Sequence, residues 1–315
     1  MFTKNKKMTR QDEEIKIGKA VWDMRTTFRA RQPYSGIFRQ CAVDFVCNSP
    51  AKPERFMEKM RLNQGCVAPL SGFGLDAEGL ERKNPVIVAL GDSVTAGHFE
   101  SLVPVTEEAF RIFIARATEM SAAGKGMPAL EITDARESYL EKFRQRLIDK
   151  YEKTSVSAIN AGIAGDNLIA MAARARRDVI RYQPDLVLIN GVLNWGPQLG
   201  TTQQYKELLK ELVQRLKVET TADIILLTPN GDVANETKWA KLMGQQPTEP
   251  STPERVEAVR EVAAEEEVCM ADVYAVWEAA REAGCPWKEL LANEVNHPGV
   301  EGHEVYADVL MKLFE

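Results

Sequence analysis

Residues 86–97 read VIVALGDSVTAG, and this stretch decides the fold. Its first five residues, Val86–Leu90, form an apolar run without alternation, which is typical of a strand buried on both faces of a parallel sheet. The same character recurs in four later runs, Val156–Asn160, Leu186–Asn190, Ile224–Thr228 and Val268–Met270. We therefore expect a central parallel sheet of five strands.

The segments between these runs read as helices, most of them with an apolar stripe and a charged outer face. They are Glu137–Tyr151, Leu168–Tyr182, Gln203–Val218, Pro253–Glu266 and Val300–Phe314. Strands that alternate with helices in this way predict a doubly wound α/β domain. Such domains bind their ligands beyond the carboxyl ends of the strands, so functional residues are expected in the loops there.

Two segments fall outside this alternation. Residues 1–80 have no clear period, and we expect an N-terminal extension or small appendage there, followed by the α/β domain over residues 81–315. Residues 98–136 form a long insert after the first strand, with a helical stretch at Glu107–Met120. A connection of this length is typical of a lid or a substrate-facing element, and a surface elaboration is the alternative.

The composition sets limits on the class of protein. The chain has 315 residues, 44% of them hydrophobic and 27% charged, as in ordinary globular proteins. A net charge of −6 argues against nucleic-acid and anionic-membrane partners. The five cysteines form no C-x-x-C pair, which favours free thiols in a reducing compartment. Because no secretion signal or membrane-length apolar run is visible, we expect a cytoplasmic protein; the oligomeric state cannot be read from the sequence.

The motif after the first strand is a favourable position for a nucleophile. In Gly91-Asp92-Ser93, the serine follows the carboxyl end of a strand and can begin a helix, where backbone N–H groups point toward an incoming oxygen. Serine also caps helices, so this motif alone leaves a structural role open. It is not the G-x-S-x-G elbow of α/β-hydrolases, because Thr95 occupies the position of the second glycine.

Three further motifs follow in order, NAGIAGD at 160–166, NGVLNW at 190–195 and NEVNHPGVEGH at 293–303. Together with the Gly91-Asp92-Ser93 motif, they resemble the signature blocks of the GDSL/SGNH hydrolase family. The resemblance runs from about Val86 to the end of the chain. It implies a flavodoxin-like three-layer α/β/α sandwich and an ester hydrolase that forms an acyl-serine, without a cofactor or metal.

The resemblance also implies roles for individual residues. Ser93 would be the nucleophile and His297 the general base that takes its proton. The backbone N–H groups of Ser93 and Gly165 and the side-chain amide of Asn194 would form the oxyanion hole. Gly165 suits this role because a main-chain donor can approach the reacting carbon there without a Cβ in the way.

The chain departs from the family pattern at three positions. Val192 replaces a glycine and Trp195 an aspartate, which leaves Asn190 as a competitor of Asn194 for the amide donor. Glu294 stands where the family has the aspartate that orients the histidine. A glutamate can do the same task, and a Ser–His dyad is the alternative.

Only three histidines are present, which makes the choice of base almost forced. His98 is too close to Ser93 in sequence to face its hydroxyl, and His303 falls within the last helix, where a packing or capping role is expected. We take Asp92, Trp195 and His98 as candidates for the substrate pocket. Trp195 in particular could stack on a sugar ring.

The expected function is hydrolysis of short-acyl carboxylic esters, such as O-acetyl groups on carbohydrates. Two alternatives stay open: a lipase or thioesterase for longer acyl chains, and a non-catalytic binding protein with the same fold. A nucleotide-binding protein is disfavoured, because Asp92 would repel a phosphate and no phosphate-binding loop is present. Zinc-ligand spacings are also absent from the sequence.

Overall fold

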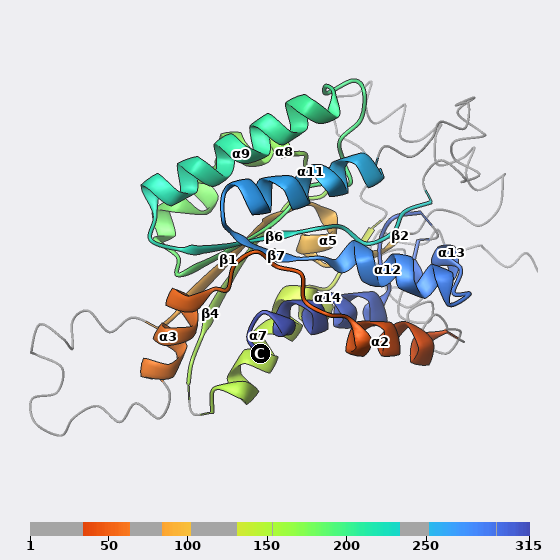
Figure 1. Ribbon diagram of the computed structural model, residues 1–315, viewed down its shortest axis with the longest axis horizontal. Coiled ribbons are helices and arrows are strands. Elements are labelled where there is room, and N and C mark those ends of the chain that lie inside the picture. The colour runs from red at the N-terminus through yellow and green to blue at the C-terminus, as the bar shows by residue number, and fades with distance from the viewer. Residues whose placement is uncertain (1–33, 64–83, 102–130, 153, 234–251, 294) are drawn as a thin grey trace, which may run out of the picture.

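A computed structural model describes residues 34–63, 84–101, 131–152, 154–233, 252–293 and 295–315. Its centre is a sheet of five parallel strands, in the order β4-β1-β5-β6-β7 (Figure 1). The strands are β1 (Val86–Gly91), β4 (Ser157–Gly162), β5 (Leu186–Asn190), β6 (Asp223–Leu227) and β7 (Cys269–Ala271). This is the flavodoxin-like order, in which the first strand lies between the second and the third. The expected parallel sheet is confirmed.

Helices cover both faces of the sheet and complete three layers (Figure 1). One layer holds α8 (Leu168–Asp178), α9 (Thr202–Glu219) and α11 (Thr252–Glu265). The other holds α7 (Tyr139–Lys150), α12 (Val273–Glu282) and α14 (Val300–Lys312). Successive residues of β1 enter opposite cores: Ile87 packs with the α7 and α14 layer, and Val88 with the α8 and α9 layer. This confirms the sandwich and explains why the strands read as unbroken apolar runs.

The helix boundaries differ from expectation where local capping decides them. The helix expected from Glu137 begins at Tyr139, because the Ser138 side chain accepts a hydrogen bond from the Glu141 backbone and caps it. The helix expected to reach Tyr182 ends at Asp178 and continues as a 3-10 turn, η2 (Ile180–Tyr182). Three further short elements lie in the connections: a second 3-10 turn, η1 (Ala135–Glu137), and the helices α5 (Ser93–Ala96) and α13 (Trp287–Leu290).

Residues 34–63, here called the N-terminal strap, pack against the sheet domain. The strap holds α2 (Ser35–Asp44) and α3 (Glu54–Asn63). Phe38 of α2 meets Trp277 edge to face, with ring centroids 4.9 Å apart, and Phe56 of α3 meets Phe314 at 6.1 Å. Both phenylalanines are fully buried. The strap therefore shares the core of the α7 and α14 layer.

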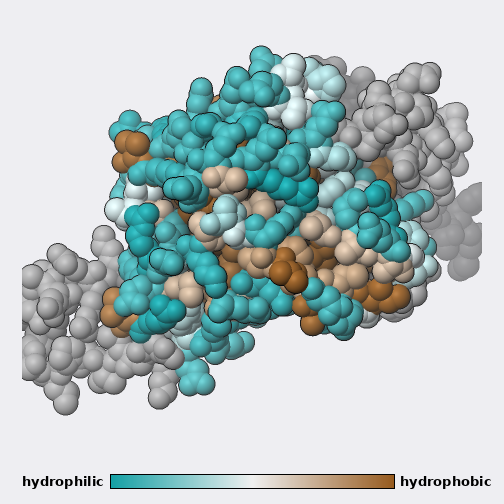
Figure 2. Space-filling view, in the orientation of Figure 1, coloured by the Kyte–Doolittle hydropathy of each residue, from teal (hydrophilic) through white to brown (hydrophobic). Residues whose placement is uncertain are grey.

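The described ends of the insert form a small antiparallel pair, β2 (His98–Ser101) and β3 (Glu131–Thr133). The helix expected at Glu107–Met120 lies outside the described residues. None of the helices in the described part of the chain combines the length and apolar character of a membrane span. Figure 2 shows a largely hydrophilic surface over α9 and more apolar side chains over α2 and α12.

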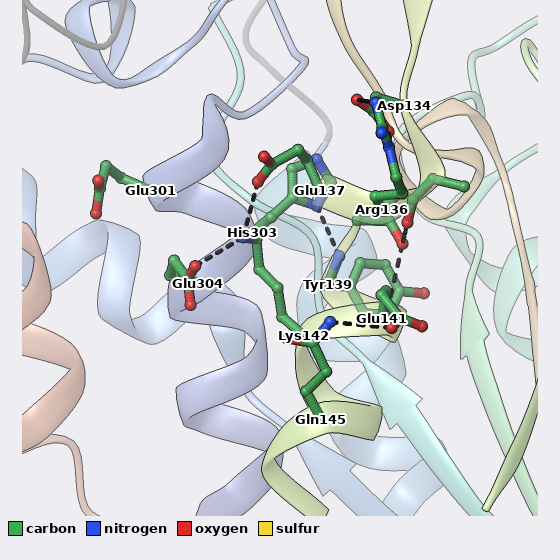
Figure 3. A network of polar contacts seen from close by, with 12 residues as sticks. Asp134, Arg136, Glu137, Tyr139, Glu141, Lys142, Gln145, Glu301, His303 and Glu304 are labelled. Carbon is green, nitrogen blue, oxygen red and sulfur yellow. Dashed lines mark hydrogen bonds and ion pairs between the residues drawn. The ribbon is translucent and has the colours of Figure 1, made fainter.

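Polar contacts join α7 to α14 (Figure 3). The backbone N–H of Tyr139 donates to Nδ1 of the buried His303 over 3.1 Å, and Lys142 binds Glu304 at 2.7 Å. Burial lowers the pKa of His303 to about 3, so its ring is neutral and can accept this bond. The structural role expected for His303 is confirmed.

Candidate active site

The Ser93 hydroxyl and the His297 ring meet beyond the carboxyl end of β1. The distance from Ser93 Oγ to His297 Nε2 is 2.9 Å, although the two residues are 204 positions apart in the chain. Each is only 4% exposed. Ser93 is the first residue of α5, which follows β1 after one residue, and His297 lies in the loop before α14. This contact places a serine hydroxyl next to a nitrogen that can take its proton.

Asp92 fixes the turn that carries Ser93. Its Oδ1 accepts a hydrogen bond from the Val94 backbone over 3.0 Å, and its side chain is the N-cap of α5. Asp92 is fully buried, and desolvation raises its pKa from 3.8 to about 7. Asp92 thus has a structural role at this turn, and its place in the wall of the substrate pocket stays a prediction.

The turn also depends on Gly91. A Cβ at this position would lie 2.0 Å from the Thr95 hydroxyl oxygen and 2.9 Å from the Asn190 carbonyl oxygen. Any other residue would push the first turn of α5 away from the end of β1. The glycine before Asp92 thus allows the sharp bend that presents Ser93.

The second and third motifs meet beside this turn. Gly165 has φ 71°, a left-handed conformation that suits glycine. Asp166 follows Gly165, and its carbonyl oxygen accepts a hydrogen bond from the side-chain amide of Asn194 over 3.0 Å. Because an amide NH₂ carries two hydrogens, Asn194 keeps one donor beyond this bond. The structure thus brings Asn194 to the Gly165 turn.

Asn190, the competing amide, lies elsewhere. It is fully buried at the end of β5, and its side chain lies beside the phenol groups of Tyr139 and Tyr306. The Tyr139 hydroxyl is in turn 2.8 Å from the Thr95 hydroxyl of α5. Asn190 therefore belongs to a buried polar layer beneath the Ser93 turn, and Asn194 is the better candidate for the oxyanion.

The loop that carries His297 is held by two asparagines that the sequence analysis did not single out. Asn293 Oδ1 accepts hydrogen bonds from the backbone N–H groups of Val295, Asn296 and His297 at 3.0, 3.0 and 2.9 Å. Asn230 Nδ2 donates to the Asn296 carbonyl over 2.8 Å. The position of Asn293 ahead of a short loop is the signal that could have revealed it, since asparagine often closes such turns. Glu294 itself lies outside the described residues.

The two remaining pocket candidates, Trp195 and His98, lie in different surroundings. Trp195 is buried in the core, where its indole N–H donates to the Gly200 carbonyl over 3.1 Å and its ring meets Tyr205 edge to face. These contacts give Trp195 a packing role, and its stacking on a substrate stays a prediction. The His98 ring, by contrast, lies 6.4 Å from the His297 ring at an angle of 88°, so His98 is a neighbour of the candidate base.

Comparison with known proteins agrees with this geometry. The model of the GDSL-like lipase/acylhydrolase family matches residues 89–305, which include Ser93 and His297. Among curated proteins, none matches the chain in sequence.

Two solved structures share the fold. A protein from Parabacteroides merdae named as a GDSL-like lipase aligns with TM-score 0.53 and 19% identity, over 74% of this chain and 96% of its own. A single-residue variant of Axe2, an acetyl-xylooligosaccharide esterase from Geobacillus stearothermophilus, aligns with TM-score 0.50 and 20% identity, over 73% and 93%. At these identities the likeness concerns the fold. Because the family match spans most of the chain and both residues of the close pair, the chain belongs to the GDSL-like lipase/acylhydrolase family and is a carboxylic ester hydrolase.

Proposed function

We propose that the chain cleaves esters through an acyl-serine intermediate formed on Ser93, with His297 as general base. The contact of 2.9 Å between Ser93 Oγ and His297 Nε2 carries this proposal. In the first step Oγ attacks the ester carbonyl while its proton passes to Nε2. The proton then leaves with the alcohol as the ester C–O bond breaks. A water molecule activated by His297 next attacks the acyl group, which releases the acid and restores Ser93.

The negative charge that develops on the carbonyl oxygen needs fixed donors. We assign this role to the backbone N–H groups of Ser93 and Gly165 and to the free hydrogen of the Asn194 amide. The left-handed turn at Gly165 and the bond from Asn194 to Asp166 support the assignment, because they bring two of these donors to one turn.

Substitution of the nucleophile tests the mechanism. Ser93→Ala removes the attacking oxygen, so we expect hydrolysis of p-nitrophenyl acetate to fall at least about 10³-fold while the thermal midpoint changes little. Ser157→Ala, which changes an exposed serine of β4, is the control and should leave the rate unchanged. A fluorophosphonate should label the wild type and the control only. Retained hydrolysis in the Ser93 variant would remove this residue from the mechanism.

We propose Glu294 as the acid that orients His297, on the ground that it occupies the family position three residues before the histidine. Glu294→Gln removes the charge that stabilises the imidazolium, so a fall in kcat of roughly 10²-fold or more is expected for a triad. A loss below about threefold would instead support the Ser–His dyad. Circular dichroism of the variant separates either result from misfolding.

For the substrate we propose short-acyl esters, with O-acetyl groups on carbohydrates as the favoured class. The support comes from the family and from Axe2, named for acetylated xylooligosaccharides. p-Nitrophenyl esters of two to twelve carbons provide the test: kcat/KM should be highest for acetate. A maximum at eight or more carbons would favour the lipase or thioesterase alternative.

A further inference from the structure

Arg174 of α8 is a buried cation that binds two carboxylates and two backbone carbonyls. It is 8% exposed, and its guanidinium binds the carboxylates of Asp166 at 2.6 Å and Asp178 at 2.9 Å. It also donates to the backbone carbonyls of Gly91 at 2.9 Å and Ala161 at 2.8 Å. These carbonyls belong to the carboxyl ends of β1 and β4, the edge of the sheet where the site lies.

One of these partners connects Arg174 to two proposed oxyanion donors. Asp166 directly follows Gly165, so a fixed Asp166 side chain restrains the turn that aims the Gly165 N–H. The Asp166 carbonyl accepts the bond from the Asn194 amide over 3.0 Å. Any shift of Asp166 would thus move both the glycine donor and the acceptor that holds the asparagine.

A second partner connects Arg174 to the nucleophile. Gly91 lies two residues before Ser93, and its carbonyl accepts bonds from Arg174 and from the Ile163 backbone N–H over 3.1 Å. The backbone N–H of Ser93 is the third proposed donor. The guanidinium therefore contacts the chain segments of the Ser93 and Gly165 donors directly and reaches the Asn194 donor through Asp166.

We propose that Arg174 is a positioning residue that sets the geometry of the oxyanion hole by joining the Ser93 turn to the Gly165 turn. This inference rests on the proposed function. The rigid, planar guanidinium has five donors and can hold two carboxylates and two carbonyls at once. A lysine keeps the charge but offers three donors at a single nitrogen, so it cannot span the same partners.

The alternative is that Arg174 only stabilises the fold. A structural role would lower the thermal midpoint and leave the turnover of the folded enzyme unchanged. A positioning role lowers kcat with little change in KM, since the donors act mainly on the transition state.

The test measures p-nitrophenyl acetate kinetics and thermal midpoints for Arg174→Lys, Asn194→Ala and the double variant. Removal of one oxyanion donor typically costs roughly 10²–10³ in kcat, and misplacement costs less. We expect Arg174→Lys to lower kcat about tenfold and to change KM less than about twofold. Arg177→Lys is the matched control, because Arg177 lies on the same helix and binds Asp178, but its side chain is 63% exposed. It should behave as the wild type.

The double variant shows whether Arg174 acts through the donors. If it does, Arg174→Lys should lower kcat less in the Asn194→Ala background than in the wild type. Additive effects, or an unchanged kcat for Arg174→Lys, would overturn the inference. Should Arg174→Lys fail to fold, Asp166→Asn offers a second route: it keeps the backbone carbonyl and weakens the ion pair, so kcat should again fall without a matching rise in KM.

Ser93→Ala, measured in parallel, distinguishes failure of the proposed mechanism from failure of the positioning role alone. If this variant is active, the proposed mechanism itself fails. If it is inactive and Arg174→Lys has wild-type kinetics, only the positioning role fails.

Discussion

Because Asp92 titrates in the turn that holds Ser93, it makes the stability of the folded protein depend on pH. Its pKa of about 7 in the folded protein lies above its ordinary value of 3.8, so the folded state holds a proton that the unfolded chain releases between these values. Stability is therefore lost as the pH rises from about 4 to 7 and changes no further above that. The cause is the cost of burying an ionised carboxylate.

Asp92→Asn should remove this pH dependence. Asparagine keeps the side-chain acceptor for Val94 and caps helices well, yet it carries no charge. An increase in pKa from 3.8 to about 7 corresponds to about 4 kcal/mol at most, which is the largest gain expected for the variant at pH 8 relative to pH 4. Urea unfolding at both pH values provides the measurement. Parallel stability profiles for variant and wild type would contradict the prediction.

At the scale of residues, the sequence located Ser93, His297, Gly165 and Asn194 because each lies in a motif at the end of a strand or before a helix. It did not reveal that Asp92 caps α5 and that Trp195 packs against Tyr205, although both lie in the same motifs. A motif gives the place of a residue along the chain, whereas the direction of its side chain depends on packing. Trp195 turns toward Tyr205 of α9, a contact that only the folded protein reveals.

Among the structural elements, the loop before α14 controls the position of His297. Asn293→Ala would leave three backbone N–H groups without their acceptor, including that of His297. We expect a loss of roughly 1–3 kcal/mol in stability and about tenfold in kcat for p-nitrophenyl acetate. Asn293→Asp keeps the acceptor oxygen and should restore most of the rate. Equal kinetics of the alanine and aspartate variants would show that these bonds do not position the histidine.

The elements of the sheet domain were largely predictable, with α12 as the exception. Its apolar residues Val273–Trp277 follow β7 with only Asp272 between, so no polar stretch separates strand from helix. Asp272 is the signal that was available, because its side chain caps α12 by accepting from the Ala275 backbone.

At the scale of the whole molecule, helix α3 of the N-terminal strap and the Ser93–His297 pair lie at opposite ends of the sheet. The backbone N–H of Phe56 donates to the Asp223 carboxylate over 2.8 Å, and Lys59 pairs with Asp185. Asp223 begins β6 and Asp185 directly precedes β5, whereas Ser93 follows the carboxyl end of β1. Helix α3 is thus placed to support the fold without entering the site.

Phe56→Ala should consequently cost stability and spare catalysis. The side chain is fully buried against Phe314, and loss of such a phenylalanine typically costs about 3–5 kcal/mol. Denaturant unfolding measures this loss, and kcat/KM at a temperature where the variant stays folded should remain within about twofold of the wild type. A large fall in kcat/KM with normal stability would show that the strap acts on the site.

The sequence did not reveal this arrangement because each strap helix contributes little to the core. Of ten residues in each, α2 buries Phe38 and Ala42, and α3 buries Phe56 and Met60. Two buried positions in a short helix give no clear period, so residues 1–80 read as irregular. The anchoring depends on partners such as Trp277 and Phe314, which lie more than two hundred positions further along.

The separation of 204 residues between Ser93 and His297 has a consequence during synthesis of the chain. A ribosome releases the strand that precedes Ser93 early and the His297 loop only after all five strands have been made. A nascent chain that lacks the last loop therefore carries Ser93 without its proposed base, and we expect it to be inactive. Hydrolytic activity should appear during refolding only once the distant loop has docked.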